Sequence, residues 1–424
     1  MTDATSHAAT ADLDLAAAIA RDAADPLAPL RARFEIPEDV IYLDGNSLGV
    51  LPKGVAARVA ATVDDEWGNG LIRSWNTAGW IDLPRRVGAR IAPLVGAAPD
   101  CVVAADSTTV NLFKVVSAAL ALRPERTRIV TETRNFPTDN YIAEGVIRQC
   151  GARHSLVHVD DPRDIPAALD RDVAVLMLTH VNYRDGSLHD MEALTRAAHD
   201  AGALVVWDLA HSAGALPVDL AGCDADFAVG CGYKYLNGGP GAPAFLYVAP
   251  RHHGGFRQPL SGWFGHSDPF DFAPRYDPAG DIGQYLCGTP PVLSMVALDA
   301  ALDVWDEVNM LAVRTKSKAL TSYFIDLVET RCAGQGLSLI SPRDAAARGS
   351  QVSFSHEAGG YAIISALIAD GVIGDFRAPD VLRFGFTPLY TRFTDVWHAV
   401  DRLAAIMEEG RWDRPEFHAR KAVT

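Results

Sequence analysis

The feature that most constrains the fold is the stretch V-A-V-L-M-L-T-H-V at residues 173–181. A continuous apolar run of this length is typical of a strand buried on both faces of a sheet. Shorter strand-like runs occur at 128–132, 203–208, 226–230 and 244–248, with helical segments between several of them. This alternation predicts an α/β domain built on a mainly parallel central sheet.

Several polar residues stand where these predicted strands end. They are Thr179, Asp208, and the pair Tyr233 and Lys234, which precedes a glycine-rich turn. Ligands of parallel sheets bind beyond the carboxyl ends of the strands, so these side chains are expected to converge. A lysine between an apolar strand and glycines is costly to bury, and desolvation favours the neutral amine that forms a Schiff base with an aldehyde. A surface lysine on a turn is the alternative.

A second polar cluster, D-S-T-T, directly precedes a strongly helical run. Thr108 and Thr109 therefore stand at a predicted helix N-terminus, where backbone N–H groups lack intrahelical partners. Such a terminus attracts phosphate through these donors and through the helix dipole. An ordinary helix cap is the alternative interpretation.

Taken together, these residues match the needs of pyridoxal 5′-phosphate. That cofactor requires an amine, an acid beside the ring nitrogen, phosphate donors, a stacking face and usually an arginine for the substrate carboxylate. Lys234 and Asp208 supply the first two, and the predicted helix start supplies the third. Phe136 opens the sequence F-P-T-D and offers a stacking face, with Asp139 nearby. Arg383 in L-R-F-G is the candidate for binding a carboxylate through two hydrogen bonds.

Composition limits the classes of partner. The chain has 424 residues, 49% of them hydrophobic, and a net charge of −15, which argues against nucleic acid or an anionic membrane as the main partner. Six scattered cysteines without a C-x-x-C pair form neither a zinc pattern nor a disulfide framework and favour a reducing compartment. No secretory signal and no run of about 18–20 apolar residues is seen. We expect a soluble, cytoplasmic protein without a metal site.

Three segments are expected along the chain. Residues 1–40 form a frayed tail followed by a short helix, and residues 41–293 form the large cofactor-binding domain. Residues 294–424 form a smaller α+β domain, joined by part of the N-terminal segment. Within the large domain, a helix is expected to begin at Pro52 and to continue to Trp67.

Longer motifs identify a family. From about Ile41 to the last helix, the chain resembles the kynureninase family, which are fold-type I pyridoxal-phosphate enzymes of the aminotransferase superfamily. The stretches that support this resemblance are Y-L-D-G-N-S-L-G, N-F-P-T-D, W-D-L-A-H-S-A-G, Y-K-Y-L-N-G-G-P-G, G-W-F-G-H and R-F-G-F-T-P-L-Y.

The resemblance implies roles for individual positions. Lys234 would form the Schiff base with the cofactor, and Asp208 would hold the pyridine nitrogen. The other residues implied for the cofactor pocket of the same subunit are Thr108, Thr109, Phe136, Asp139, Thr179, His211 and Tyr233. Trp263 and Thr289 would approach the cofactor from the neighbouring subunit, which implies a homodimer. Arg383 would bind the α-carboxylate of the substrate.

The implied reaction is hydrolysis of the Cβ–Cγ bond of L-kynurenine, and of 3-hydroxykynurenine, to anthranilate or 3-hydroxyanthranilate and L-alanine. This step belongs to tryptophan catabolism and to the route towards NAD. Some family members that favour the hydroxylated substrate have asparagine at the position of Thr289, so threonine favours plain kynurenine. Tyr233 is the candidate proton donor to Cβ; a tyrosine that only binds phosphate is the rival interpretation.

Other pyridoxal-phosphate proteins share parts of this pattern. A cysteine desulfurase or selenocysteine lyase needs a reactive cysteine on a loop well after the lysine, and Cys332 lies earlier than such a loop would. An aminotransferase would release a 2-oxo acid. A non-catalytic regulator usually adds a DNA-binding domain, and no basic helix-turn-helix segment is seen.

Overall fold

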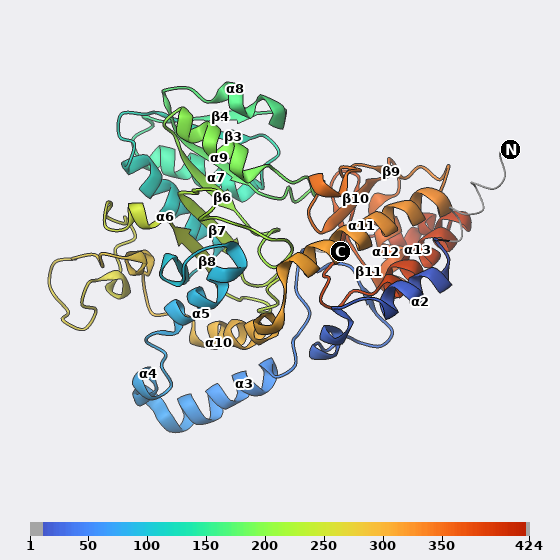
Figure 1. Ribbon diagram of the computed structural model, residues 1–424, viewed down its shortest axis with the longest axis horizontal. Helices are drawn as coiled ribbons and strands as arrows, with labels where there is room; N and C mark the ends of the chain where they lie inside the picture. Colours follow the sequence, from blue (N-terminus) through green and yellow to red (C-terminus); the bar gives the residue numbers. More distant parts are fainter. Residues whose placement is uncertain (1–11, 421–424) are drawn as a thin grey trace. The chain divides into compact units, whose positions relative to one another are not determined.

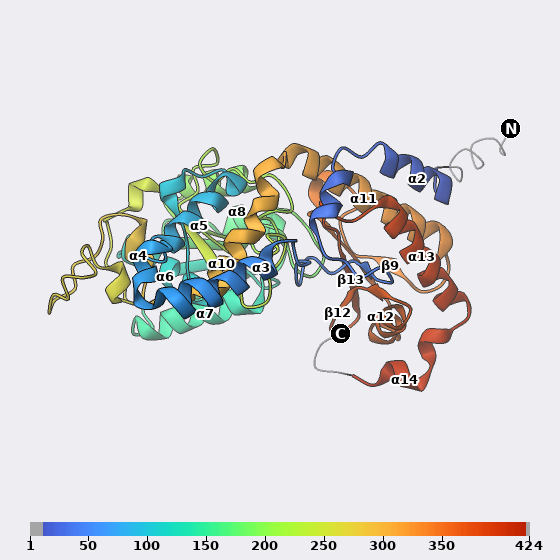
Figure 2. The ribbon, with the colours of Figure 1, turned by 90° about the horizontal axis from the view of Figure 1, so that it is seen from below.

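The computed structural model describes residues 12–420, which divide into two compact units. The central unit comprises Gly54–Asn182 and His189–Asp303. The terminal unit comprises the described residues up to Lys53, together with Tyr183–Leu188 and the chain from Val304 onward. Figures 1 and 2 show both units from two directions. The tail expected before the first helix falls mostly on residues 1–11, outside the described part.

The central unit is built on a sheet that has seven strands within the described residues, in the order β2-β8-β7-β6-β5-β3-β4. The strands are β2 (Val102–Ala104), β3 (Arg128–Glu132), β4 (Ser155–Val159), β5 (Val173–Thr179), β6 (Leu204–Asp208), β7 (Phe227–Cys231) and β8 (Ala244–Val248). Only β8 runs against its two neighbours, and the other pairings are parallel. The predicted α/β class with a mainly parallel sheet is confirmed.

Helices cover both faces of this sheet because successive strand residues point to opposite sides. On one face, Val206 joins an apolar core with residues of α6 (Thr108–Ala121) and α7 (Pro137–Gln149). On the other face, Trp207 donates from Nε1 to Thr195 Oγ1 of α9 (Met191–Asp200) at 3.1 Å. The unit also contains α4 (Ser74–Thr77), α5 (Leu83–Ile91), α8 (Ile165–Ala168) and α10 (Val292–Ala301).

The helix expected from Pro52 to Trp67 differs in the structure. α3 (Val55–Ala61) begins three residues later, because Gly54 caps it in a left-handed conformation with φ of 91°. Residues Thr62–Gly70 then continue with π-helical geometry. Pro52 instead forms an isolated bridge with Phe34.

The terminal unit contains an antiparallel sheet with the order β12-β13-β10-β9 and a parallel pair of β1 with β11. These strands are β1 (Ile41–Tyr42), β9 (Ser338–Leu339), β10 (Gln351–Ser355), β11 (Val372–Ile373), β12 (Asp375–Arg377) and β13 (Val381–Gly385). The helices are α2 (Leu15–Ala23), α11 (Met310–Arg331), α12 (Gly360–Ala369), α13 (Phe393–Glu408) and α14 (Pro415–His418).

The N-terminal segment is tied to the end of the chain within this unit. Asp22 of α2 accepts hydrogen bonds from the backbone N–H groups of Phe393 and Thr394 at 2.6 and 3.1 Å, and from the Thr394 hydroxyl at 2.6 Å. A carboxylate at these first N–H groups of α13 is stabilising, because they carry the positive end of the helix dipole. No helix within residues 12–420 is long and apolar enough to span a bilayer.

Candidate active site

Lys234 lies just beyond the carboxyl end of β7, in the glycine-rich turn that the sequence singled out. Its Nζ is 2.9 Å from Nε2 of His211, which follows β6. The same amine lies 6.0 Å from the ring centroid of Phe136 and 5.9 Å from that of Tyr233. The turns after different elements therefore bring four of the predicted residues together around one amine.

Two buried carboxyl groups belong to the same site. Asp208 ends β6 and accepts a hydrogen bond from the Ala210 N–H at 2.8 Å, and Asp139 lies in the first turn of α7. Burial raises the pKa of Asp208, and the Ala210 N–H and the Lys234 amine oppose that rise. Burial and then the charge of Asp208 raise the pKa of Asp139 well above its ordinary value. A site of this kind gains stability when a positive group enters it.

This arrangement fits pyridoxal 5′-phosphate. Neither carboxyl oxygen of Asp139 has a hydrogen bond of good geometry within residues 12–420, although Asn135 lies close enough to lower its pKa. A protonated ring nitrogen bound beside Asp208 would supply the missing positive charge. Phe136 is 40% exposed, so its ring face is available for stacking. The amine, the acid and the stacking face thus occur together in one unit.

Thr179 and Tyr233 line the same edge of the sheet. Thr179 pairs in register with Asp208, and its hydroxyl donates to the Val181 carbonyl at 3.3 Å. Tyr233 is half-buried, and burial, followed by the neighbouring Cys231, raises the pKa of its phenol. The phenol therefore keeps its proton at neutral pH, as a proton donor must.

The predicted phosphate site is a real helix start. α6 begins at Thr108, and the Ser107 hydroxyl caps it by accepting from the Val110 N–H at 3.3 Å. Thr108 is half-buried and Thr109 is exposed. Asp106, directly before the cap, has a φ of 48°, which is unusual for a residue other than glycine. The backbone N–H groups of the first turn remain suited to an anion.

Sequence reasoning missed Lys114, which fixes this helix start. Its side chain is fully buried, and its Nζ contacts the carboxylate of Asp106 and donates to the Tyr285 carbonyl at 2.5 Å. The sequence did contain an indication of this role, since Lys114 is the sole charged residue in α6. A single lysine on an apolar helix can be buried only beside an anion, and Asp106 stands eight positions before Lys114.

Trp263 and Thr289 make their contacts elsewhere in the segment that follows β8. Trp263 packs edge-on against Phe264 and Phe270, with ring centroids 5.0 and 5.7 Å apart. Thr289 is exposed and lines a cavity of about 20 Å³ with Asp106. The contacts found for Trp263 and Thr289 within residues 12–420 thus do not include Lys234, His211 or Phe136.

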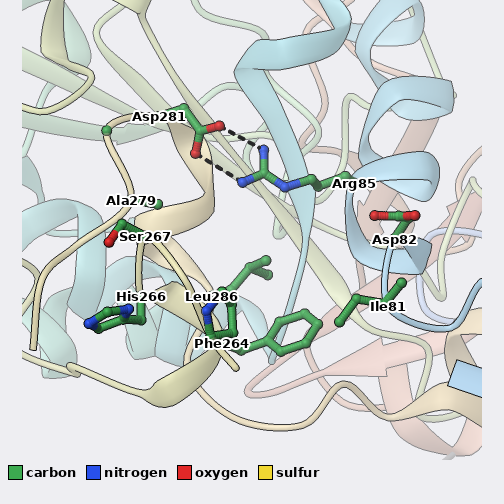
Figure 3. Close-up of a pocket in the computed structure, with 11 residues that line it drawn as sticks. Ile81, Asp82, Arg85, Phe264, His266, Ser267, Ala279, Asp281 and Leu286 are labelled. Carbon is green, nitrogen blue, oxygen red and sulfur yellow. Dashed lines mark hydrogen bonds and ion pairs between the residues drawn. The ribbon is translucent and has the colours of Figure 1, made fainter. Parts of the chain in front are cut away.

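A cavity of about 410 Å³ lies between this segment and the start of α5. Arg85 and Asp281 form a two-bonded ion pair at its edge, at 2.9 and 3.0 Å, while Phe264 and Leu286 line another side (Figure 3). None of the predicted site residues lines this cavity. The Arg85–Asp281 pair fastens the segment to α5.

Arg383 belongs to the terminal unit and is almost fully buried on β13. Its Nε and Nη2 donate to the two carboxylate oxygens of Asp375 at 2.9 and 2.7 Å. Its other edge meets neutral acceptors, namely the Tyr183 carbonyl at 2.6 Å and the Ser47 hydroxyl at 3.2 Å. The guanidinium predicted to bind a substrate carboxylate is thus held in place by a carboxylate of the chain itself, a partner that the sequence analysis did not anticipate.

Comparisons with known proteins indicate the family of this chain. Residues 313–403 match the family model described as Kynureninase C-terminal domain. The kynureninases of Burkholderia mallei and Pseudomonas fluorescens are each 56% identical to this chain, over 96% of it and over 99% and 98% of their own lengths. A solved cysteine desulfurase from Thermococcus onnurineus NA1 has a TM-score of 0.74 at 19% identity, covering 90% of this chain and 98% of that one. A C-DES mutant with glycine covalently linked to its PLP cofactor has a TM-score of 0.75 at 16% identity, covering 88% and 98%.

The chain thus has the fold of the fold-type I pyridoxal-phosphate enzymes, as expected from the sequence, and its kynureninase relatives define it as an enzyme of that class. Within that class, the chain belongs to the kynureninase family. The cysteine desulfurase alternative is not favoured, because its representatives share the fold at much lower identity. In addition, Cys332 is buried, and burial raises its pKa to about 11, so its thiol stays protonated.

Proposed function

We propose that this chain is a pyridoxal-phosphate-dependent hydrolase that cleaves the Cβ–Cγ bond of L-kynurenine to give anthranilate and L-alanine. It acts in the same way on 3-hydroxykynurenine, as a step in tryptophan catabolism and in the supply of NAD precursors. The observation that carries the proposal is the lysine site within a chain that is 56% identical to kynureninases over 96% of its length.

The bound cofactor supplies an aldehyde that condenses with amines and a ring that accepts an electron pair from the substrate. Lys234 would hold the cofactor aldehyde through its amine, and the free amine would move the proton at Cα of the substrate, with His211 Nε2 at 2.9 Å orienting it. Asp208 would keep the ring nitrogen charged, and Phe136 would stack on the ring. The first turn of α6 at Thr108 and Thr109 would bind the phosphate.

Cleavage requires water at the γ-carbonyl and a proton for Cβ once anthranilate leaves. Tyr233 is our candidate for that proton, because its raised pKa keeps the phenol protonated and its ring lies 5.9 Å from the Lys234 amine. Tyr233→Phe should lower kcat by about 100-fold or more, in the usual range of general acid–base catalysis. The affinity for the cofactor should change little. Unchanged turnover would remove Tyr233 from the proton transfer.

Arg383 binds the substrate α-carboxylate through the guanidinium edge that faces the Tyr183 carbonyl and the Ser47 hydroxyl. A carboxylate is a stronger acceptor than either group, since both partners are then charged. Asp375 holds the opposite edge and fixes the plane of the fork.

We infer that the active form is a cytoplasmic homodimer in which Trp263 and Thr289 complete the site of the neighbouring subunit. Large apolar side chains in the segment after β8 support this, since Phe270 and Phe272 are 56% and 75% exposed. We also propose a division into a cofactor-binding domain at 41–293 and a smaller domain at 294–424; the two compact units differ from it at residues 41–53, 183–188 and 294–303.

The direct test is to incubate the purified holoenzyme with L-kynurenine and to measure anthranilate by fluorescence and alanine by chromatography. Both products should appear in equal amounts, and Lys234→Ala should abolish them, whereas the exposed-lysine control Lys53→Ala should not. L-Cysteine should release no sulfide. If neither product forms while the absorbance of the bound cofactor is intact, the proposed function is wrong.

A further inference from the structure

A separate cavity of about 390 Å³ lies at the C-terminal ends of α6 and α7. Its apolar wall includes Leu120, Val146 and Phe256, and its polar lining includes Arg153, His154 and Arg257. α6 rises by 1.5 Å per residue, so this end of the helix is about 20 Å from Thr108. The cavity is therefore distinct from the lysine site, although both belong to the central unit.

The charges in this cavity are unpaired. Neither Arg153 nor Arg257 makes a hydrogen bond or an ion pair with any residue of the described chain, and both side chains are exposed. Many other arginines of this acidic protein pair with a carboxylate, as Arg251 does with Asp224 and Asp226. Two guanidinium groups at one cavity create a local positive potential in a chain whose net charge is −15.

The third polar group is a buried histidine without a partner. His154 is only 6% exposed, and neither of its ring nitrogens has a hydrogen-bond partner within residues 12–420. Burial and the nearby Arg153 lower its pKa, so the ring is neutral at neutral pH. A neutral imidazole offers one donor and one acceptor, and leaving both unused in a buried place is unfavourable.

We propose that this cavity is a second binding site, for a small aromatic carboxylate. The aromatic ring lies against Leu120, Val146 and Phe256, and the carboxylate is bound by Arg153 and Arg257. The His154 ring donates its N–H to the ligand. The volume is within the range of small-molecule pockets, and apolar walls with a few convergent polar groups are typical of them.

The position of this cavity indicates how a bound ligand would affect the neighbouring segments. Phe256 and Arg257 stand seven and six residues before Trp263, on the segment that leaves β8, while the opposite wall is made by α6 and α7. A bound carboxylate bridges these elements and therefore restrains the beginning of that segment. Binding and restraint can be measured without any assay of turnover.

The test uses the holoenzyme with benzoate as the probe. Equilibrium dialysis should reveal a saturable site whose dissociation constant rises by about ten-fold or more in the Arg153→Ala/Arg257→Ala variant, since a charge-assisted pair is lost. The matched control is Arg148→Ala/Arg196→Ala, which removes two exposed arginines of α7 and α9 that each pair within their own helix. Benzamide, which has the ring without the charge, should bind at least about ten-fold more weakly than benzoate.

A second measurement needs no substitution. Cys150 lines the same cavity and is an exposed cysteine, so benzoate should slow its alkylation by iodoacetamide, whereas Cys223 should react at the same rate with or without benzoate. Benzoate binding that is unaffected by Arg153→Ala/Arg257→Ala but lost in Arg383→Lys would place the probe in the substrate site and overturn the proposal. Equal affinity for inorganic sulfate and benzoate would also overturn it.

Discussion

Replacing Lys114 with methionine removes a buried charge while keeping the length and apolar character of the side chain. The Nζ of Lys114 joins the carboxylate of Asp106 to the carbonyl of Tyr285, and the side chain is fully buried. The variant leaves an unpaired carboxylate beside the start of α6 and an unused carbonyl. Both the stability of the central unit and the geometry of the proposed phosphate site should suffer.

The magnitude follows from the burial of the two partners. Removing one member of a buried ion pair costs about 3–5 kcal/mol. The Asp106 side chain is 33% exposed, so water recovers part of that cost, and we expect a loss of about 2–3 kcal/mol. If half of this loss is expressed at the helix start, the affinity for the cofactor falls by about ten-fold.

The assay is a titration of the apoenzyme with pyridoxal 5′-phosphate, followed by absorbance, together with urea unfolding of the same samples. The exposed-lysine control Lys53→Met should match the wild type in both. The double variant Asp106→Asn/Lys114→Met should be more stable than Lys114→Met alone, because no unpaired charge is left. A Lys114→Met protein that binds the cofactor and unfolds like the wild type would refute this account.

Three further predictions concern charged groups elsewhere. The hydrogen bond to Asp226 at 2.8 Å raises the pKa of His199. Its stabilisation is therefore complete below the ordinary histidine pKa and is lost as pH rises through the raised one. The free energy of unfolding of His199→Gln, measured with urea, should be about 1–2 kcal/mol below that of the wild type in mild acid and should approach it in alkali. Burial and then Asp375 raise the pKa of Asp44 to about 7, so the folded form loses stability as pH rises from about 4 to about 7. Asp44→Asn should be more stable than the wild type at pH 8, and its free energy of unfolding should no longer fall over that pH range. An unchanged dependence on pH would show that Asp44 is not the group responsible. Arg383→Lys should raise KM by about ten-fold with the cofactor absorbance intact, because lysine cannot bind a carboxylate through a planar fork. As a control, the KM of Arg377→Lys should stay within about two-fold of the wild-type value.

Much of the central unit could be predicted from local sequence. β5 and β6 are continuous apolar runs, and capping residues mark the start of α6. The ends of these strands and the start of the helix were therefore predicted to within one or two residues. These signals are local, because they depend on burial and backbone hydrogen bonding of the segment itself. The convergence of Lys234, His211 and Phe136 then follows from the parallel topology.

What could not be predicted depends on distant partners. The bounds of the 22-residue helix α11 were not predicted. Its buried face includes Lys316, whose charge is accommodated by an ion pair with Asp25, 2.6 Å away, and by a hydrogen bond to the Pro388 carbonyl at 2.6 Å. Likewise, Asp375 faces Arg383 because β12 pairs with β13 in one particular register. No feature of either segment alone reveals that pairing.

The terminal unit is assembled from both ends of the chain, which has a consequence for synthesis on the ribosome. α2 and its Asp22 emerge first, but their partners at the start of α13 emerge more than 300 residues later. At a synthesis rate of about 5–20 residues per second, α2 is without its partner for tens of seconds, while most of the central unit has already been synthesised and can fold. A nascent chain halted near residue 340 should therefore carry a protease-resistant sheet and a digestible N-terminal segment.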